Sequence, residues 1–250
     1  MTVVSRRKSR VSAPSVSSDL DPLELYAGAI DTSDYVAQIA PLVRRSVPAV
    51  GDLLDVGAGG GQLGRALRDS GHRSTAIEPS PTMRARLAAL DRPPEILACG
   101  WKEANLPAAG HDTVLAATMP AFLDEPEHFL ARCRDWARRT VVWIVPAHAG
   151  PRGLCFAGCL PAAWHGEDET PGIDVMLQGL APSSRPREIA FVDWTFSAVV
   201  VDLPKLAAYL SDRLGWPVSD GCSRLLSHLS RRARLRLRIP TLRSLSISQT

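Results

Sequence analysis

The chain contains a cluster of glycines between a predicted apolar strand and a predicted helix, and this cluster limits the folds open to it. Residues 52–56 have the composition of a short buried strand, glycines follow within 57–61, and Gln62–Ser70 shows helical spacing of apolar residues. Glycine lets a loop come close to a ligand because no Cβ intervenes, and the first turn of the next helix presents unpaired N–H groups. The pattern predicts a ligand site at the end of this strand.

Strands and helices alternate along the following residues. Helices are predicted to begin after Ser80, which is a good N-cap, and at a capping box formed by Asp124 and Glu127. Such alternation produces right-handed βαβ units around a mostly parallel sheet. We therefore expect a doubly wound α/β domain with helices on both faces and an N-terminal helical cap within 22–47. The further predicted strands are 73–77, 95–98, 113–118, 141–145 and 188–201.

Basic residues are concentrated at the two ends of the chain. Residues 1–18 hold four basic residues and no acid, and residues 221–250 hold seven arginines and no acid. Removing these eleven from the 29 basic residues leaves 18 against 26 acids, so the body has a net charge of −8. We expect a disordered basic tail at 1–18, a domain over 19–220, and a basic C-terminal tail at 221–250.

Composition excludes several classes of protein. No stretch approaches the ~20 apolar residues of a membrane span. The five cysteines are odd in number and lack framework spacing, which is typical of a reduced cytoplasmic chain. The basic start is not followed by the apolar segment of a secretory signal. We therefore expect a cytoplasmic protein without a membrane span.

The glycine spacing separates two cofactor families. Dinucleotide binders use G-x-G-x-x-G, whose third glycine would fall at position 62, where this chain has glutamine. The pattern acid-x-G-x-G-x-G is matched at all four positions by Asp55, Gly57, Gly59 and Gly61. With these residues in place, the chain resembles the class I S-adenosylmethionine-dependent methyltransferases, and residues 52–145 follow the core of that family in order.

The resemblance implies a Rossmann-like sheet of the seven-stranded type and S-adenosylmethionine as the cofactor. Gly57, Gly59 and Gly61 would let the loop pass close to the methionine part of the cofactor. Asp55 would order the loop and help to hold the cofactor amino group. Glu78 ends the second strand, where a carboxylate suits both ribose hydroxyls.

The segment Gly100–Pro107 corresponds to the adenine side in the family. Many members have an aspartate after the glycine, whereas this chain has Trp101. Two interpretations of Trp101 stay open, since its ring either packs against the adenine or covers the edge of the sheet. The resemblance places Glu103 near the adenine amino group.

Residues 146–188 interrupt the alternation and are predicted to form an insertion or lid over the acceptor site. The cysteines, histidines and acids in this segment lack a standard zinc spacing, so no metal is predicted. His148 and His165 are candidates for a general base, although the interpretation we favour for both is a structural role in the loop. The possible ligands in this segment are His148, Cys155, Cys159, His165, Glu167 and Asp168.

The expected function is transfer of a methyl group from S-adenosylmethionine to a small or medium-sized acceptor, through O, N or C. Thr118-Met119-Pro120, after the fourth strand, lacks the D/N/S-P-P-aromatic signature of enzymes that methylate exocyclic amines. Two alternatives stay open. One is an RNA methyltransferase held by its basic tails, and the other is a regulatory protein that binds S-adenosylmethionine without turnover.

Overall fold

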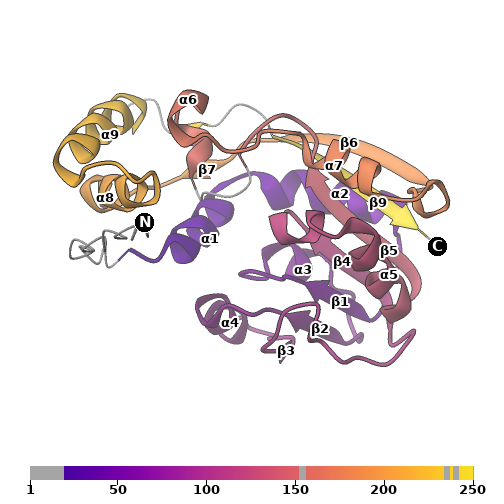
Figure 1. The fold of residues 1–250 in the computed structure, drawn as a ribbon. Coiled ribbons are helices and arrows are strands. Elements are labelled where there is room, and N and C mark those ends of the chain that lie inside the picture. The colour runs from indigo at the N-terminus through magenta and orange to yellow at the C-terminus, as the bar shows by residue number, and fades with distance from the viewer. Residues whose placement is uncertain (1–19, 152–155, 234–236, 239–241, 250) are drawn as a thin grey trace, which may run out of the picture.

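The computed structural model describes residues 20–151, 156–233, 237–238 and 242–249, and its centre is a twisted sheet (Figure 1). The sheet strands are β1 (Leu53–Val56), β2 (Ser74–Ile77), β3 (Glu95–Leu97), β4 (His111–Ala117), β5 (Ala137–Pro146), β6 (Glu188–Trp194) and β9 (Leu242–Gln249). Their order is β3-β2-β1-β4-β5-β9-β6, with β1 to β5 parallel and β9 antiparallel to both neighbours. The predicted mostly parallel α/β sheet is confirmed.

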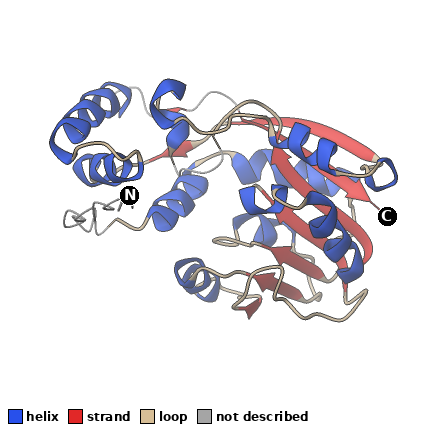
Figure 2. Ribbon diagram, in the orientation of Figure 1, coloured by secondary structure: helices blue, strands red, loops and turns tan. Residues whose placement is uncertain are grey.

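Helices cover both faces of the sheet, as Figure 2 shows. Within the described residues, no helix is long and apolar enough to cross a membrane. The helices are α1 (Pro22–Thr32), α2 (Tyr35–Ser46), α3 (Gln62–Leu67), α4 (Pro81–Ala88), α5 (Pro126–Trp136), α6 (Ala162–His165), α7 (Gly172–Gly179), α8 (Leu203–Arg213) and α9 (Val218–Ala233). Short 3-10 turns lie at Pro120–Leu123, Ala157–Cys159 and Pro182–Ser184, and a separate pair of strands is formed by β7 (Ser197–Ala198) and β8 (Leu237–Arg238).

Two apolar cores result from the alternation of side chains along the strands. Leu53 and Leu115 are buried in the core shared with α2 and α3, whereas Leu54 and Val114 are buried in the core shared with α5 and α7. Each such side chain contributes about 1.5–3 kcal/mol when it is fully buried. Burial of both faces explains why these strands are short apolar runs.

The predicted helix starts have different outcomes. The Ser80 hydroxyl caps α4 by accepting a hydrogen bond from the Met83 N–H at 3.3 Å, which confirms that prediction. The capping box predicted at 124–127 is wrong, because the N-cap of α5 makes no side-chain hydrogen bond. The Glu127 carboxylate instead accepts hydrogen bonds from the Ala181 N–H and the Ser184 hydroxyl. The Glu127 carboxylate, which the local pattern assigned to the helix cap, thus binds residues that are distant in the sequence.

The C-terminal region differs from the predicted tail at 221–250. Helix α9 begins before residue 221, and β9 lies in the sheet between β5 and β6. Leu245 is paired with Val145 on one side and with Phe191 on the other. The predicted strand over 188–201 is also divided, because β6 ends at Trp194. The predicted disordered tail at 1–18 lies outside the described residues.

The segment 146–188 divides into two parts with different surroundings. Helix α7 packs against β5, and its Ile173 and Met176 belong to the same core as α5. Residues 156–165 lie in the other core, where Phe156 contacts Phe196. Both parts therefore pack into a core of the sheet, one on each face, and a role of this segment as a lid over the acceptor stays a prediction.

Because β9 lies between two other strands of the sheet, we predict that a substitution in it changes the stability of the protein although β9 has no part in the predicted site. Ser246 is paired with Ala190 inside the sheet. Because proline has no N–H and disrupts a central strand, Ser246→Pro should lower the melting temperature by more than about 5 °C, whereas Ser246→Ala should change it by less than about 2 °C. Equal melting temperatures for the two variants in thermal denaturation would show that β9 is not a central strand.

Candidate functional site

The conformation of the loop after β1 depends on its glycines. Gly57, Gly59 and Gly61 have φ values of 65°, 56° and 77°, which lie in the left-handed region that favours glycine. The Gly57 N–H donates a hydrogen bond of 2.8 Å to the carbonyl of Ile77, so the loop is fixed to the end of β2. Gly61 is the N-cap of α3. The three glycines of the predicted motif therefore shape one turn between β1 and α3.

The three glycines differ in what a side chain would meet. A Cβ on Gly57 would lie 2.8 Å from the Phe122 ring, and one on Gly61 would lie 2.5 Å from Leu87. A Cβ on Gly59 would have no heavy atom within 4 Å. Gly57 and Gly61 thus allow close packing inside the protein, whereas Gly59 faces open space through which a ligand can approach the backbone.

Glu78 links this loop to the start of α4. Its side chain follows β2 and the residue is 5% exposed. One carboxylate oxygen accepts a hydrogen bond from the Gly59 N–H and the other accepts one from the Ser80 N–H, both at 2.8 Å. Each carboxylate oxygen has a second lone pair. The carboxylate can therefore accept hydrogen bonds from a pair of ligand hydroxyls while it holds the loop.

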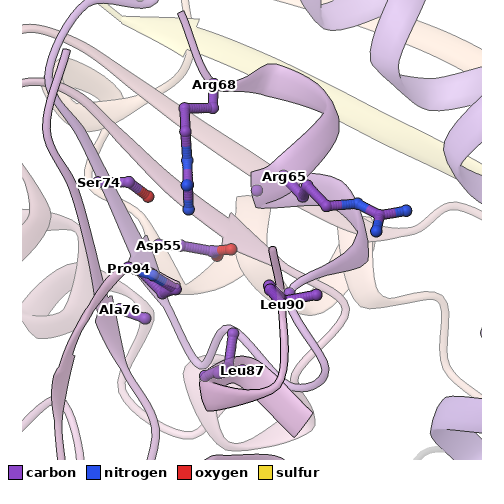
Figure 3. Close-up of a pocket in the computed structure, with 10 residues that line it drawn as sticks. Asp55, Arg65, Arg68, Ser74, Ala76, Leu87, Leu90 and Pro94 are labelled. Carbon is purple, nitrogen blue, oxygen red and sulfur yellow. The ribbon is translucent and has the colours of Figure 1, made fainter. Parts of the chain in front are cut away.

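Asp55 lies beneath the loop rather than on its open side. It is buried in β1, and a side chain at Gly64 would meet its carboxylate. Burial, followed by the negative charge of Glu78, raises the pKa of Asp55 to about 7. Figure 3 shows Asp55 and Arg68 pointing into one small pocket, in which the Arg68 Nε atom is buried without a hydrogen-bond partner. The other lining residues are Gly61, Gly64, Arg65, Ser74, Ala76, Leu87, Leu90 and Pro94.

The two residues predicted for the adenine side have contrasting positions. Trp101 is buried, and its ring makes edge-on contacts with Phe129 and His128 at centroid distances of 5.2 and 5.1 Å. Glu103 is exposed, and its carboxylate folds back over Gly100. Trp101 is thus a core residue beside β4 and α5, and its contact with an adenine ring stays a prediction.

The two histidines that were candidates for a general base have different surroundings. The His165 side chain is 1% exposed, its Nδ1 atom accepts a hydrogen bond from the Glu167 N–H, and its Nε2 atom lies 3.4 Å from the Glu169 carboxylate. These contacts organise the loop itself. His148 follows β5 at the carboxyl edge of the sheet, and its Nδ1 atom is buried without a partner. Cys155 of the same segment lies outside the described residues.

Polar contacts join α1 to the glycine loop and to α4. The Gln62 amide donates hydrogen bonds to Asp31 and to the Ala27 carbonyl. Arg86 of α4 is paired with both Glu24 and Asp31 of α1. These pairs were not predicted from the sequence, although acids seven residues apart fall on one face of a helix.

The central segment matches a known family. Residues 54–144 match the family model of a methyltransferase domain. The resemblance to class I S-adenosylmethionine-dependent methyltransferases is thereby confirmed over that segment. A comparison with curated proteins finds no match.

Solved structures share the fold at low sequence identity. A protein assigned as a methyltransferase of an antibiotic biosynthesis pathway in Anabaena variabilis aligns with a TM-score of 0.51 and 16% identity, over 84% of this chain and 96% of that chain. The [4+2]-cyclase SpnF aligns with a TM-score of 0.50 and 18% identity, over 85% of this chain and 80% of that chain. These likenesses show the fold, and the second shows that the fold alone does not define a reaction.

The raised pKa of Asp55 predicts how stability depends on pH. An acid whose pKa is raised on folding contributes stability below its ordinary pKa of about 4, and this contribution is lost as pH rises through about 7. Asp55→Asn removes this ionisation from the surroundings of Glu78 and Arg68. In urea unfolding, the wild-type protein should therefore lose stability relative to Asp55→Asn between about pH 4 and pH 7. Parallel pH profiles for the two proteins would contradict the assignment.

Proposed function

We propose that this chain binds S-adenosylmethionine and transfers its methyl group to a small or medium-sized acceptor in the cytoplasm. The observation that carries the proposal is the buried Glu78 carboxylate, which holds the Gly59 N–H beside the open side of the glycine loop. A carboxylate in this place suits a ligand with two neighbouring hydroxyls, as on a ribose. The acidic body of the chain argues against a nucleic acid as the acceptor.

The residues fit the cofactor in three places. Gly59 leaves room for the methionine part, and Glu78 offers its remaining lone pairs to the ribose hydroxyls. Glu103, exposed after β3, is the acid available to the adenine amino group. Asp55 supports the loop from below. When bound, S-adenosylmethionine supplies an electrophilic methyl group on a sulfonium.

Methyl transfer is an in-line displacement, in which an acceptor lone pair forms the bond to carbon while the carbon–sulfur bond breaks. The electron pair of that bond stays on sulfur, and any acceptor proton passes to water or to a nearby base. Alignment of the two reactants supplies about 7–11 kcal/mol of the barrier. The chain therefore acts mainly by holding the reactants in line and excluding water, and α1 is placed to cover the glycine loop.

If Glu78 binds the ribose hydroxyls, its substitution by alanine should lower the affinity for the cofactor. Glu78→Ala removes two charge-assisted hydrogen bonds to hydroxyls and releases Gly59, so S-adenosylmethionine binding should weaken by ~2–3 kcal/mol in calorimetric titration. Glu95→Ala, which changes an exposed acid at the opposite end of the sheet, is the matched control and should leave affinity unchanged. A loss under about 0.5 kcal/mol in Glu78→Ala would show that Glu78 holds the loop but does not contact the cofactor.

The open space at Gly59 predicts a steric effect. Gly59→Val places a side chain where the cofactor would approach, so binding should be abolished while far-UV circular dichroism stays native. Gly71→Val is the control, because Gly71 has a similar φ of 79° and equally open surroundings outside the loop. If Gly59→Val folds and binds S-adenosylmethionine with wild-type affinity, the glycine loop is not the cofactor site.

A further inference from the structure

Strand β6 forms one edge of the sheet (Figure 1). Among the strands that the structure describes, it pairs with β9 alone, and the register runs from Glu188 to Trp194 without a bulge. It has seven residues, whereas β3 at the other edge has three. An edge strand presents a row of N–H and C=O groups with which another strand can pair. Strand β6 is therefore the edge of this sheet that is long enough to accept a further strand.

The two faces of β6 have different surroundings. Trp194 is buried in the core shared with α2, whereas Phe191 is 58% exposed and Ile189 is 42% exposed. The register runs from Val145 through Leu245 to Phe191, so Phe191 lies on the same face of the sheet as α5 and α7. Helix α7 packs against β5, two strands away, and leaves the outer face of β6 in solvent. One face and the edge of β6 are thus both open.

This edge also lacks the features that protect edge strands from association. Proteins protect such strands by making them short, or with charges, prolines or bulges along them. Strand β3 is short and begins with the exposed Glu95. The centre of β6, residues 189–192, is instead the apolar run Ile-Ala-Phe-Val. An apolar edge of this kind favours aggregation unless a specific partner covers it.

The sequence of this edge is complementary to itself. In an antiparallel pair of two β6 strands with a two-fold axis through Ala190, Ile189 lies opposite Phe191 of the second copy. In the same register Arg187, just before the strand, lies opposite Asp193 of the second copy, and both residues are exposed. Cross-strand pairs of an aromatic with a β-branched residue, and of opposite charges, are favourable. Symmetry produces each of these pairs twice.

Neighbouring registers lose this match. With the axis through Phe191, Asp193 would lie opposite Ile189, and with the axis through Ile189, Arg187 would lie opposite Phe191. Either shift places a charged residue opposite an apolar one. The register through Ala190 is the one that matches charge with charge and apolar residue with apolar residue.

We propose that the β6 edge binds a second copy of this chain, as an antiparallel β6–β6 pair with its two-fold axis through Ala190. The two sheets then form one continuous sheet, and the exposed Ile189 and Phe191 side chains cover each other across the interface. Because the same edge is used by both copies, the assembly closes as a dimer. The inference is independent of the proposed function, since β1 and its glycine loop lie four strands away from β6.

The test measures the oligomeric state of the full chain by sedimentation velocity over a series of concentrations. The wild type should form a dimer. Phe191→Lys should raise the dimer dissociation constant about tenfold or more, because a charge in the middle of an edge strand opposes pairing. Val201→Lys is the matched control, since Val201 is 95% exposed and lies outside β6, and it should dimerise like the wild type. A wild type that stays monomeric, or that forms open-ended assemblies, would overturn the proposal.

An exchange of charges tests the register. Arg187→Asp places two acids opposite each other, and Asp193→Arg places two arginines opposite each other, so each variant alone should self-associate about tenfold more weakly or worse. An equimolar mixture should form a mixed dimer, because every charge at 187 then meets the opposite charge at 193. Melting temperatures establish that each variant is folded, and Phe191→Lys tests the edge without either charge variant. A dimer that is unaffected by these substitutions would use another surface and would contradict the proposal.

Discussion

The organisation of the site depends on one carboxylate. Glu78 accepts hydrogen bonds from the N–H groups of Gly59 and Ser80, and so joins the loop after β1 to the helix after β2. The glycines can hold their left-handed conformations because the loop is also fixed by the Ile77 carbonyl. A buried charge is tolerated in a protein when such donors surround it. The same carboxylate keeps unused lone pairs on the open side of the loop, so the group that builds the turn can also contact a ligand.

Unfavourable features gather at the carboxyl edge of β1 and β4. Asp55 is an acid whose pKa is raised by burial, and Thr118 has a strained backbone with a φ of 55°. The two apolar cores on either side of the sheet supply the stability that makes this concentration possible. The opposite edge of the sheet has satisfied ion pairs, such as Asp52 with Arg73 and Asp112 with Arg138. This asymmetry agrees with a ligand site at the end of the strands where parallel α/β sheets bind their ligands.

The fold was predictable where local pattern and global packing agree. The glycine motif, the short apolar strands and the Ser80 cap depend on neighbours in sequence, and each was found from the sequence. Strand β9 was missed because its arginine and serines resemble a polar tail, and only pairing with β5 and β6 identifies it as a strand. Helix α7 lies inside the segment predicted to be an insertion, and its packing against β5 could not be predicted because it depends on tertiary contacts. In the site, Glu78 and the glycines were indicated by spacing, whereas the contacts of Gln62 with α1 depend on tertiary structure. The roles of Glu78 and the glycines toward a cofactor stay predictions.

We propose that the glycine loop and Glu78 form a site for S-adenosylmethionine rather than for a dinucleotide. The most direct test is calorimetric titration of the wild-type full chain, in separate experiments, with S-adenosylmethionine, S-adenosylhomocysteine and NAD. We expect binding of the first two with dissociation constants near micromolar, about −8 kcal/mol in free energy, and no measurable binding of NAD. Binding of NAD alone would contradict this assignment, because the loop would then bind a dinucleotide.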